Sequence, residues 1–175
     1  AGTTNDILKQ AITSINREFS GTPYEIIIVG PSWLKKESFL SHIKIVPYYE
    51  LNISPGLITK KKNMGVATAI YDKIILSHDY VALESGFRAG FEKFGYNFDV
   101  CMTPVINSDG SRWIDWLGYF PEIGFAMIPY EIEGTKYQYI NGTYFIVKRN
   151  FFVKFPLDER LRWNEGEDSL WSSQI

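Results

Sequence analysis

The chain has 175 residues, of which 45% are hydrophobic and 16% aromatic, with a formal net charge of −2. This length supports one domain with a substantial core rather than two. The near-neutral charge argues against a broad basic surface for nucleic acid, and no apolar run reaches the ~18 residues that a membrane span needs. The single cysteine, Cys101, excludes an internal disulfide and is typical of a reducing compartment.

No secretory signal peptide is visible at the amino terminus, so we expect a cytoplasmic protein. Asn52 and Asn141 begin two tripeptides that match the N-glycosylation pattern. Without a signal peptide, we interpret both matches as coincidental.

The first half of the chain predicts one helix and two buried strands. Helical spacing of apolar residues predicts an amphipathic helix that is capped by Thr4 or Asn5 and runs to about Phe19. The continuous apolar run YEIIIVG at residues 24–30 is typical of a parallel strand that is buried on both faces. A second run, KIILSHDY at residues 73–80, begins with buried-strand residues and ends with polar ones.

Later segments continue the alternation of helices and strands. We expect a helix over 82–94, strands over 98–106, 122–132 and 143–149, a turn over 108–112, and a short helix over 149–155. This alternation indicates an α/β layer fold with helices covering a sheet. In such sheets, ligands bind beyond the carboxyl ends of the strands, and both Gly30 and the pair His78–Asp79 lie at such ends.

The pair His78–Asp79 is a candidate metal site. A strand that ends in these residues places an imidazole and a carboxylate at the rim of the sheet. A hard divalent cation with a bound diphosphate needs only one or two carboxylates, and Mn2+ also accepts imidazole. The alternative is that Asp79 caps the next helix while His78 is a packing residue.

Two further clusters carry charge. The stretch TKKKNMGVATA at 59–69 places three lysines before Asn63 and Gly65, where a helix amino terminus would suit phosphate. The alternative is a solvated charge run before a helix. In the stretch EGED, Gly166 lets the backbone turn and present Glu167 and Asp168, so a carboxylate held there can serve as a general base. The alternative is an acidic surface turn that caps a helix.

An aromatic cluster with one acid is the fourth candidate. Trp113 and Trp116 flank Asp115, so their rings could stack on a sugar while the carboxylate accepts bonds from its hydroxyls. The alternative is a core tryptophan pair around an acid that is satisfied within the protein.

Taken in order, these segments resemble a nucleotide-sugar glycosyltransferase of the GT-A type, close to the large inverting family 2. YEIIIVGPS stands where that family has EIIVVDDGS, after an amphipathic helix. Lys62, Asn63, Gly65 and Ala69 match its pattern K-N-x-G-x-x-x-A. IILSHDY stands where the family has an apolar strand that ends in an Asp-x-Asp metal motif.

The resemblance continues to the carboxyl-terminal part of the chain. NGTYFIVKRNFFVKFPLDERLRWNEGEDSLW is similar to the family's glycine-rich strand, short helix, FDE and W-G-x-E-D, and to the WGGED element of galactosyltransferase-like enzymes. Three departures stand out. Gly30 replaces the aspartate that contacts uracil, and His78-Asp79-Tyr80 leaves one carboxylate where two are common. The chain also begins at AGTTND, where a first strand should already have ended.

The resemblance implies a mixed, mostly parallel central sheet in a Rossmann-like α/β/α sandwich, as one domain over 1–175 that is a clipped module of a longer chain. It implies inverting transfer of a sugar from a nucleotide-diphosphate donor, such as a UDP-sugar, to an acceptor hydroxyl in glycan synthesis, with Mn2+ or Mg2+ bound. The resemblance implies two catalytic residues, Asp168 as base and Glu167, and two metal ligands, Asp79 and His78. The implied donor or cofactor contacts are Gly2, Thr3, Gly30, Lys62, Asn63, Gly65, His78 and Asp79. The implied substrate contacts are Trp113, Asp115, Trp116, Asn141 and Gly142. The alternative is a non-catalytic nucleotide- or carbohydrate-binding domain on the same scaffold. A nucleotidyltransferase ranks last, because AGTTNDILK is a poor match to its glycine-rich signature.

Overall fold

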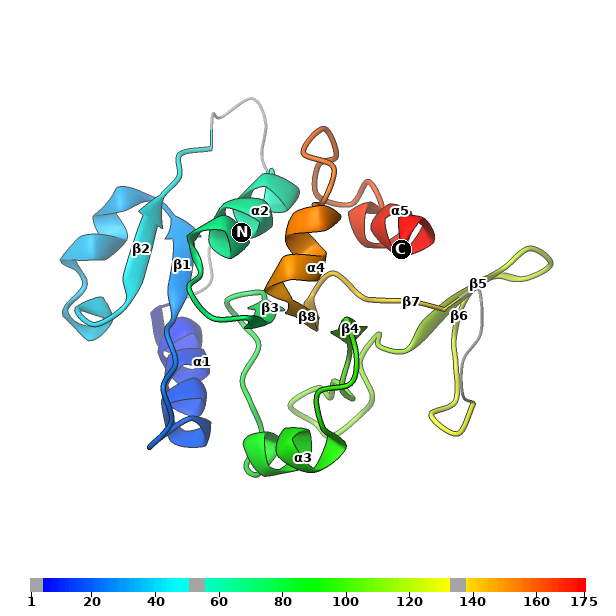
Figure 1. Ribbon diagram of the computed structural model, residues 1–175, viewed down its shortest axis with the longest axis horizontal. Coiled ribbons are helices and arrows are strands. Elements are labelled where there is room, and N and C mark those ends of the chain that lie inside the picture. The colour runs from blue at the N-terminus through cyan, green and yellow to red at the C-terminus, as the bar shows by residue number, and fades with distance from the viewer. Residues whose placement is uncertain (1–4, 51–55, 133–137) are drawn as a thin grey trace.

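The computed structural model of the protein describes residues 5–50, 56–132 and 138–175 (Figure 1). Its helices are α1 (Asn5–Glu18), α2 (Ile58–Thr68), α3 (Phe87–Phe94), α4 (Arg149–Lys154) and α5 (Glu167–Gln174). Its strands are β1 (Ile27–Gly30), β2 (Lys44–Pro47), β3 (Lys73–Ser77), β4 (Val100–Cys101), β5 (Leu117–Phe120), β6 (Gly124–Met127), β7 (Gln138–Tyr139) and β8 (Tyr144–Lys148). Two 3₁₀ turns, Ser32–Lys36 and Ser38–Leu40, connect β1 to β2.

The described strands form three small sheets. β1 and β2 pair in parallel, β3, β8 and β4 form an antiparallel sheet with β8 in the middle, and β6, β5 and β7 form a second antiparallel sheet around β5. In Figure 1, α2, α4 and α5 lie above the β3–β8–β4 sheet and α3 lies below it, while the β5–β6 hairpin extends to the right.

The core is organised around β8, which is buried on both faces. Phe145 and Val147 point to one side and pack against α2, α4 and α5. Tyr144 and Ile146 point to the other side and pack against α1 and α3. Side chains alternate between the faces of a strand, so a strand covered by helices on both faces needs a continuous apolar run. This requirement explains the sequence YFIV.

A further apolar cluster joins α1 to the β1–β2 pair and its connection. Its buried members are Ile12, Leu34, Leu40 and Ile43. The apolar stripe predicted for the first helix is therefore divided, with Ile12 facing β1 and β2 and Ile15 facing the β8 cluster. This division lets α1 tie the parallel pair to the rest of the molecule.

The expected mixed α/β class is confirmed, whereas the mostly parallel central sheet is not. Among the described strands only β1 and β2 run parallel, and β3 pairs antiparallel with β8. The apolar run at 73–77 correctly indicated burial on both faces. It carried no information on the direction of the partner strand, because burial and direction are independent properties of a strand.

Local boundaries also differ from the sequence predictions. The three lysines lie inside α2, which begins at Ile58, so the helix start that was expected after them is wrong. The helix expected over 82–94 begins at Phe87, after Gly86 in the left-handed conformation. β2, β5 and β7 were not anticipated.

No helix in the parts of the chain that the structure describes is long and apolar enough to cross a membrane.

The central position of β8 gives a stability prediction. Phe145 is 1% exposed and its ring lies against those of Phe152 and Trp171. Phe145→Ala should lower the free energy of unfolding by about 3–5 kcal/mol, because it removes buried contacts and leaves a cavity. Phe94→Ala, at a position that is 71% exposed, should change it by less than about 0.5 kcal/mol. Urea denaturation followed by circular dichroism measures both, and equal losses would contradict the assigned core.

Candidate functional site

A pocket of about 170 Å³ lies where the carboxyl end of β3, the turn before β8 and the amino end of α5 meet. Its lining residues are His78, Asn141, Gly142, Thr143, Trp163, Asn164, Gly166, Glu167 and Asp168. These residues come from three segments that are distant in the sequence. The pocket therefore joins the strand-end motif at 78 to the acidic motif at 167–168.

Antiparallel pairing of β3 with β8 brings two of the three segments together, residue 78 and the turn at 141–143. The ladder ends with Ser77 opposite Tyr144, and the backbone N–H of His78 donates to the carbonyl oxygen of Thr143 at 2.9 Å. In an antiparallel pair, the carboxyl end of one strand lies beside the amino end of its partner. His78 is consequently held beside the Asn141–Thr143 turn.

A buried lysine lies under the pocket. Lys62, in the middle of α2, is 7% exposed, and its Nζ donates to the carbonyl oxygen of Gly142 at 2.6 Å. Nζ also lies 3.7 Å from Oε1 of Glu167, which is itself buried. Burial lowers the pKa of Lys62, and the negative charges of Glu167 and Asp168 oppose that shift. The ion pair compensates part of the cost of removing both charges from water.

Gly142 is the point at which these groups converge. Its N–H donates to Oδ2 of Asp168 at 2.8 Å, while its carbonyl accepts from Lys62. A Cβ atom at this position would lie 2.9 Å from Oε1 of Glu167, 3.2 Å from Nζ of Lys62 and 3.3 Å from Oδ2 of Asp168. Only glycine leaves the space in which the charged groups can meet.

Asp168 is anchored in the first turn of α5. Its Oδ1 accepts from the N–H of Ser169 at 2.8 Å, and its Oδ2 accepts from Gly142. The amino terminus of a helix favours a carboxylate, and Gly166 starts the turn with φ 73°. Oδ1 also accepts from the Ser169 hydroxyl at 3.4 Å, whereas Oδ2 keeps a second lone pair with which Asp168 can accept a hydrogen bond from a hydroxyl in the pocket.

His78 presents an imidazole nitrogen whose hydrogen-bonding capacity is unused. Its Nδ1 lies 2.8 Å from the hydroxyl of Tyr80, while its buried Nε2 has no partner among the described residues. Burial lowers the pKa of His78 to about 4, and the charge of Lys62 adds to this effect while Asp79 opposes it. The imidazole is therefore neutral at pH 7 and can act as a ligand or a hydrogen-bond partner.

The donor set at His78 and Asp79 fits a divalent cation in part. His78 lines the pocket while its unpartnered Nε2 is buried, and Asp79, the next residue, is exposed. Within the described ranges, however, no three His, Cys, Asp or Glu side chains are grouped to hold a metal ion. Two protein ligands suit a cation that takes its other ligands from phosphate oxygens.

Three of the residues expected to bind the donor lie within the fold, away from the pocket. The side chain of Asn63 bonds both backbone groups of Leu157, at 2.9 Å to the carbonyl and 3.1 Å from the N–H. Gly65 lies in α2, where a Cβ would meet Val29 of β1 at 3.6 Å. Gly30 is buried at the end of β1. All three residues lie outside the lining of the pocket.

Asp115 agrees with the alternative interpretation, in which the hydrogen bonds of its carboxylate are satisfied within the protein. It is 0% exposed, and its Oδ1 accepts from Nε of Arg112 at 2.6 Å. Its Oδ2 accepts from the N–H of Val105 at 2.6 Å and from the hydroxyl of Tyr130 at 2.7 Å. This carboxylate holds the loop together and is inaccessible to a substrate in this structure.

The remaining predicted residues divide into two groups. Trp113 is partly exposed and Trp116 partly buried, and neither is among the described residues that line the pocket. Their role in substrate binding stays a prediction. Gly2 and Thr3 lie outside the described residues.

Trp163 is a pocket residue that sequence reasoning missed. Its side chain is exposed and lines the pocket. Its backbone N–H donates to the carbonyl of Gly56 at 2.8 Å. The hydroxyl of Thr59 donates to the carbonyl of Leu161 at 3.0 Å and holds the same segment against α2. The available signal was a tryptophan three residues before the glycine of the acidic motif.

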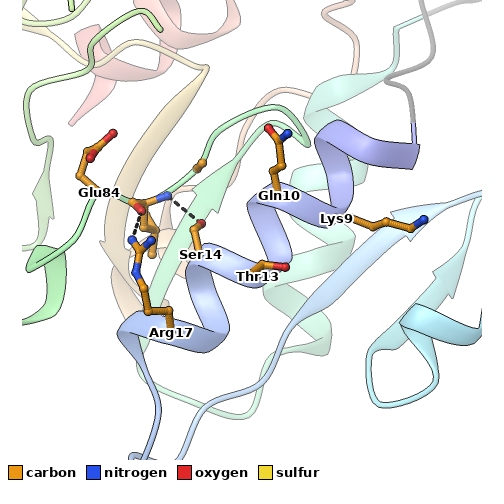
Figure 2. A pocket seen from close by; sticks show the side chains of 8 residues that line it. Lys9, Gln10, Thr13, Ser14, Arg17 and Glu84 are labelled. Carbon is orange, nitrogen blue, oxygen red and sulfur yellow. Dashed lines mark hydrogen bonds between the residues drawn. The ribbon is translucent and has the colours of Figure 1, made fainter.

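A larger pocket of about 400 Å³ lies between α1 and the 82–84 segment (Figure 2). Ser14 accepts from the N–H of Leu83 at 2.8 Å and donates to the carbonyl of Ala11 at 2.6 Å. Arg17 donates to the carbonyl of Leu83 at 2.6 Å, as the dashed lines in Figure 2 show. These groups are occupied in joining α1 to the loop. The smaller pocket, which His78 and Asp168 both line, is the better candidate.

No protein family model matches the chain, and neither the curated proteins nor the solved structures contain a match.

The environment of His78 gives a pH-dependence prediction. Its pKa is about 4 in the folded protein and 6.5 ordinarily, so between these values the unfolded chain binds more protons. Stability should therefore fall as pH decreases from about 7 to 4, by up to about 3 kcal/mol from this group. Urea denaturation across this range, with a chelator present, measures the loss. His78→Gln should make the dependence shallower, and a variant with the same pH dependence as the wild type would show that His78 is not its source.

The space around Gly142 gives a second prediction. Gly142→Ala should lower the free energy of unfolding by roughly 1–3 kcal/mol, because the new methyl group overlaps the charged groups. Gly90→Ala in α3, where a Cβ meets nothing within 4 Å, should raise it by roughly 0.5–1 kcal/mol. Thermal and chemical denaturation measure both changes. A neutral Gly142→Ala would show that the cluster does not constrain this position.

Proposed function

We propose that the protein transfers a sugar, with inversion, from a nucleotide-diphosphate donor to an acceptor hydroxyl. The observation that carries this proposal is the meeting of the strand-end residue His78 with the helix-borne acid Asp168 in one pocket. Such a transfer needs a base for the acceptor and, close by, groups that face the leaving phosphate. Among the described helices, the cover on both faces of the β3–β8–β4 sheet is compatible with the GT-A type of sandwich.

Asp168 is the proposed general base. The acceptor hydroxyl oxygen attacks the anomeric carbon of the donor from the face opposite the nucleotide. A new C–O bond forms while the bond from that carbon to the diphosphate oxygen breaks, and the bonding electrons leave with the diphosphate. The hydroxyl proton passes to Asp168, whose carboxylate is held at the start of α5 by two backbone N–H groups. General base catalysis of this kind contributes roughly 10²–10⁴-fold in rate.

Glu167 has a different role from Asp168. It is buried and lies 3.7 Å from the Lys62 ammonium, so its charge is partly neutralised within the protein. We assign it to positioning Lys62, and through it the Gly142 turn, rather than to proton transfer. Lys62 in turn adds positive charge beneath the pocket.

His78 and Asp79 are the residues that would hold a divalent cation. Bound there, it supplies Lewis-acid stabilisation of the negative charge that develops on the diphosphate. The contribution of the chain itself is a neutral imidazole, which adds no charge of its own to the site.

The size of the pocket limits what it encloses. Ligand pockets commonly have roughly 300–1,000 Å³, whereas this one has about 170 Å³. We propose that it receives the reacting sugar and that the nucleotide extends outside it. The exposed ring of Trp163 at its edge offers an apolar surface to a ligand that projects from the pocket.

A second candidate is a non-catalytic nucleotide- or carbohydrate-binding domain. The observation that favours it is the absence of Asp79 from the described lining, which leaves His78 as the only predicted metal ligand in the pocket. Such a domain would bind the same ligands without turning them over. Incubation with a panel of nucleotide sugars and Mn2+, followed by assay of released nucleoside diphosphate, separates the two candidates.

The transferase proposal predicts that Asp168→Asn lowers the rate of transfer by roughly 10²–10⁴-fold. Binding of the donor, measured as a ligand-induced rise in thermal stability, should remain, because the substitution leaves the shape of the pocket unchanged. Asp99→Asn is the matched control, since that carboxylate is exposed and pairs with Lys148 outside the pocket. An Asp168→Asn variant that transferred sugar at the normal rate would exclude this residue as the base.

A further inference from the structure

The β6–β5–β7 sheet presents an aromatic face to solvent. In its register, Tyr119 of β5 lies opposite Phe125 of β6, and Leu117 lies opposite both Met127 and Tyr139. Directly opposed residues project from the same face of a sheet, and so do residues two apart along a strand. Leu117, Tyr119, Phe125, Met127 and Tyr139 therefore share one face.

The rings on this face contact one another. The ring centroid of Phe125 lies 5.1 Å from that of Tyr119 and 5.7 Å from that of Tyr139. Leu117 is buried in this face, while Phe125 is 63% exposed and Tyr119 is half exposed. The result is a preformed apolar surface in which the three rings hold one another in place. Contiguous exposed apolar surface of this kind marks an interaction site.

The aromatic face is continuous with the candidate active site through β7. α5 begins with Glu167 and Asp168, and Ser172 in its second turn accepts a bond from the N–H of Ile140, directly after β7. Burial raises the pKa of Tyr139, and the charge of Asp168 adds to this shift while a hydrogen bond with Ser169 opposes it. Tyr139 thus lies close enough to Asp168 to sense its charge. Figure 1 shows β7 leading from the β5–β6 hairpin toward the centre of the molecule.

The two neighbouring surfaces recognise complementary parts of one kind of ligand. Aromatic rings bury apolar C–H surface, whereas the Asp168 carboxylate and the Asn141 side chain accept bonds from hydroxyls. A saccharide carries both features, since its rings have apolar faces and a rim of hydroxyl groups. A nucleotide diphosphate fits less well, because its charge would approach Asp168 with no positive side chain among the described residues that form this face.

We infer that the aromatic face formed by Tyr119, Phe125 and Tyr139 binds the saccharide acceptor and directs one of its hydroxyls toward Asp168. The inference rests on the proposed transferase function and adds the acceptor site to it. The acceptor lies along β5 and β7 with a terminal sugar at the pocket. The donor enters from the side of His78, so the two substrates approach the reacting atoms from different elements.

The test is a binding titration of the full chain with a defined panel. The saccharide probes are cellobiose, lactose, maltose and diacetylchitobiose, and uridine represents the competing class of ligand. Saturation-transfer NMR measures the binding of each probe. The wild type should bind at least one disaccharide, and Tyr119→Ala/Phe125→Ala should weaken that binding at least tenfold. Phe125→Tyr alone should bind the disaccharide about as well as the wild type does, because it keeps an aromatic ring. Phe94→Ala, which removes an equally exposed ring elsewhere, should have no effect.

The outcomes separate this inference from the proposed function. Disaccharide binding that the double variant leaves unchanged, or no disaccharide binding to the wild type, overturns the inference even where the protein turns over a nucleotide sugar. Uridine binding that the double variant removes also overturns it. Disaccharide binding that depends on Phe125, in a protein that turns over no donor, supports the aromatic face and overturns the transferase. A concentration-dependent dimer in sedimentation that Phe125→Ala dissolves assigns the face to a second copy and overturns the inference.

Discussion

The site depends on one buried interaction, the hydrogen bond from the Lys62 ammonium to the carbonyl of Gly142. It joins α2 to the turn before β8, and the same lysine pairs with Glu167 of α5. A charged group that is removed from water is tolerated only where it is paired and hydrogen-bonded, so these three elements are fixed together. Gly142 adds to this constraint, because its N–H binds Asp168 while its missing side chain leaves room for the charges.

The same arrangement answers why a short stretch of chain holds several acids. Glu165 accepts from the N–H of Arg162 and closes a turn, Glu167 pairs with Lys62, and Asp168 accepts from two backbone N–H groups. Each acid therefore has its own donor, and the helix amino terminus favours the negative charge. Glu167 and Asp168 both line the pocket, but Glu167 is buried and Asp168 is only partly buried, which makes Asp168 the centre of the proposed chemistry.

Sequence patterns predicted what depends on local chemistry and missed what depends on pairing. The helix at α1 followed from apolar spacing, and the acidic motif from a glycine beside two carboxylates. The direction of β3 relative to β8 did not follow, because it is decided by a distant partner, and the burial of Asp115 did not follow, because it also needs Val105 and Tyr130. Asp115 is satisfied by Arg112 three residues away and by Val105 across a loop, and nothing in its neighbourhood distinguishes it from an exposed ligand-binding acid. The burial of Lys62 could not be predicted either, because its partners Gly142 and Glu167 are distant in the sequence and its neighbours are lysines.

The register between β3 and β8 has a consequence for how the chain can vary in length. With Ser77 opposite Tyr144, a residue inserted or deleted between Gly142 and β8 has two possible effects. If Gly142 stays on Lys62, the ladder slips and every side chain of β8 turns to the opposite layer. If the register is kept, the Gly142 carbonyl moves away from Lys62. The 121–123 tip of the β5–β6 hairpin has no such coupling, since it projects into solvent. Related chains should therefore keep the spacing from Gly142 to Lys148 and differ in length at the hairpin tip.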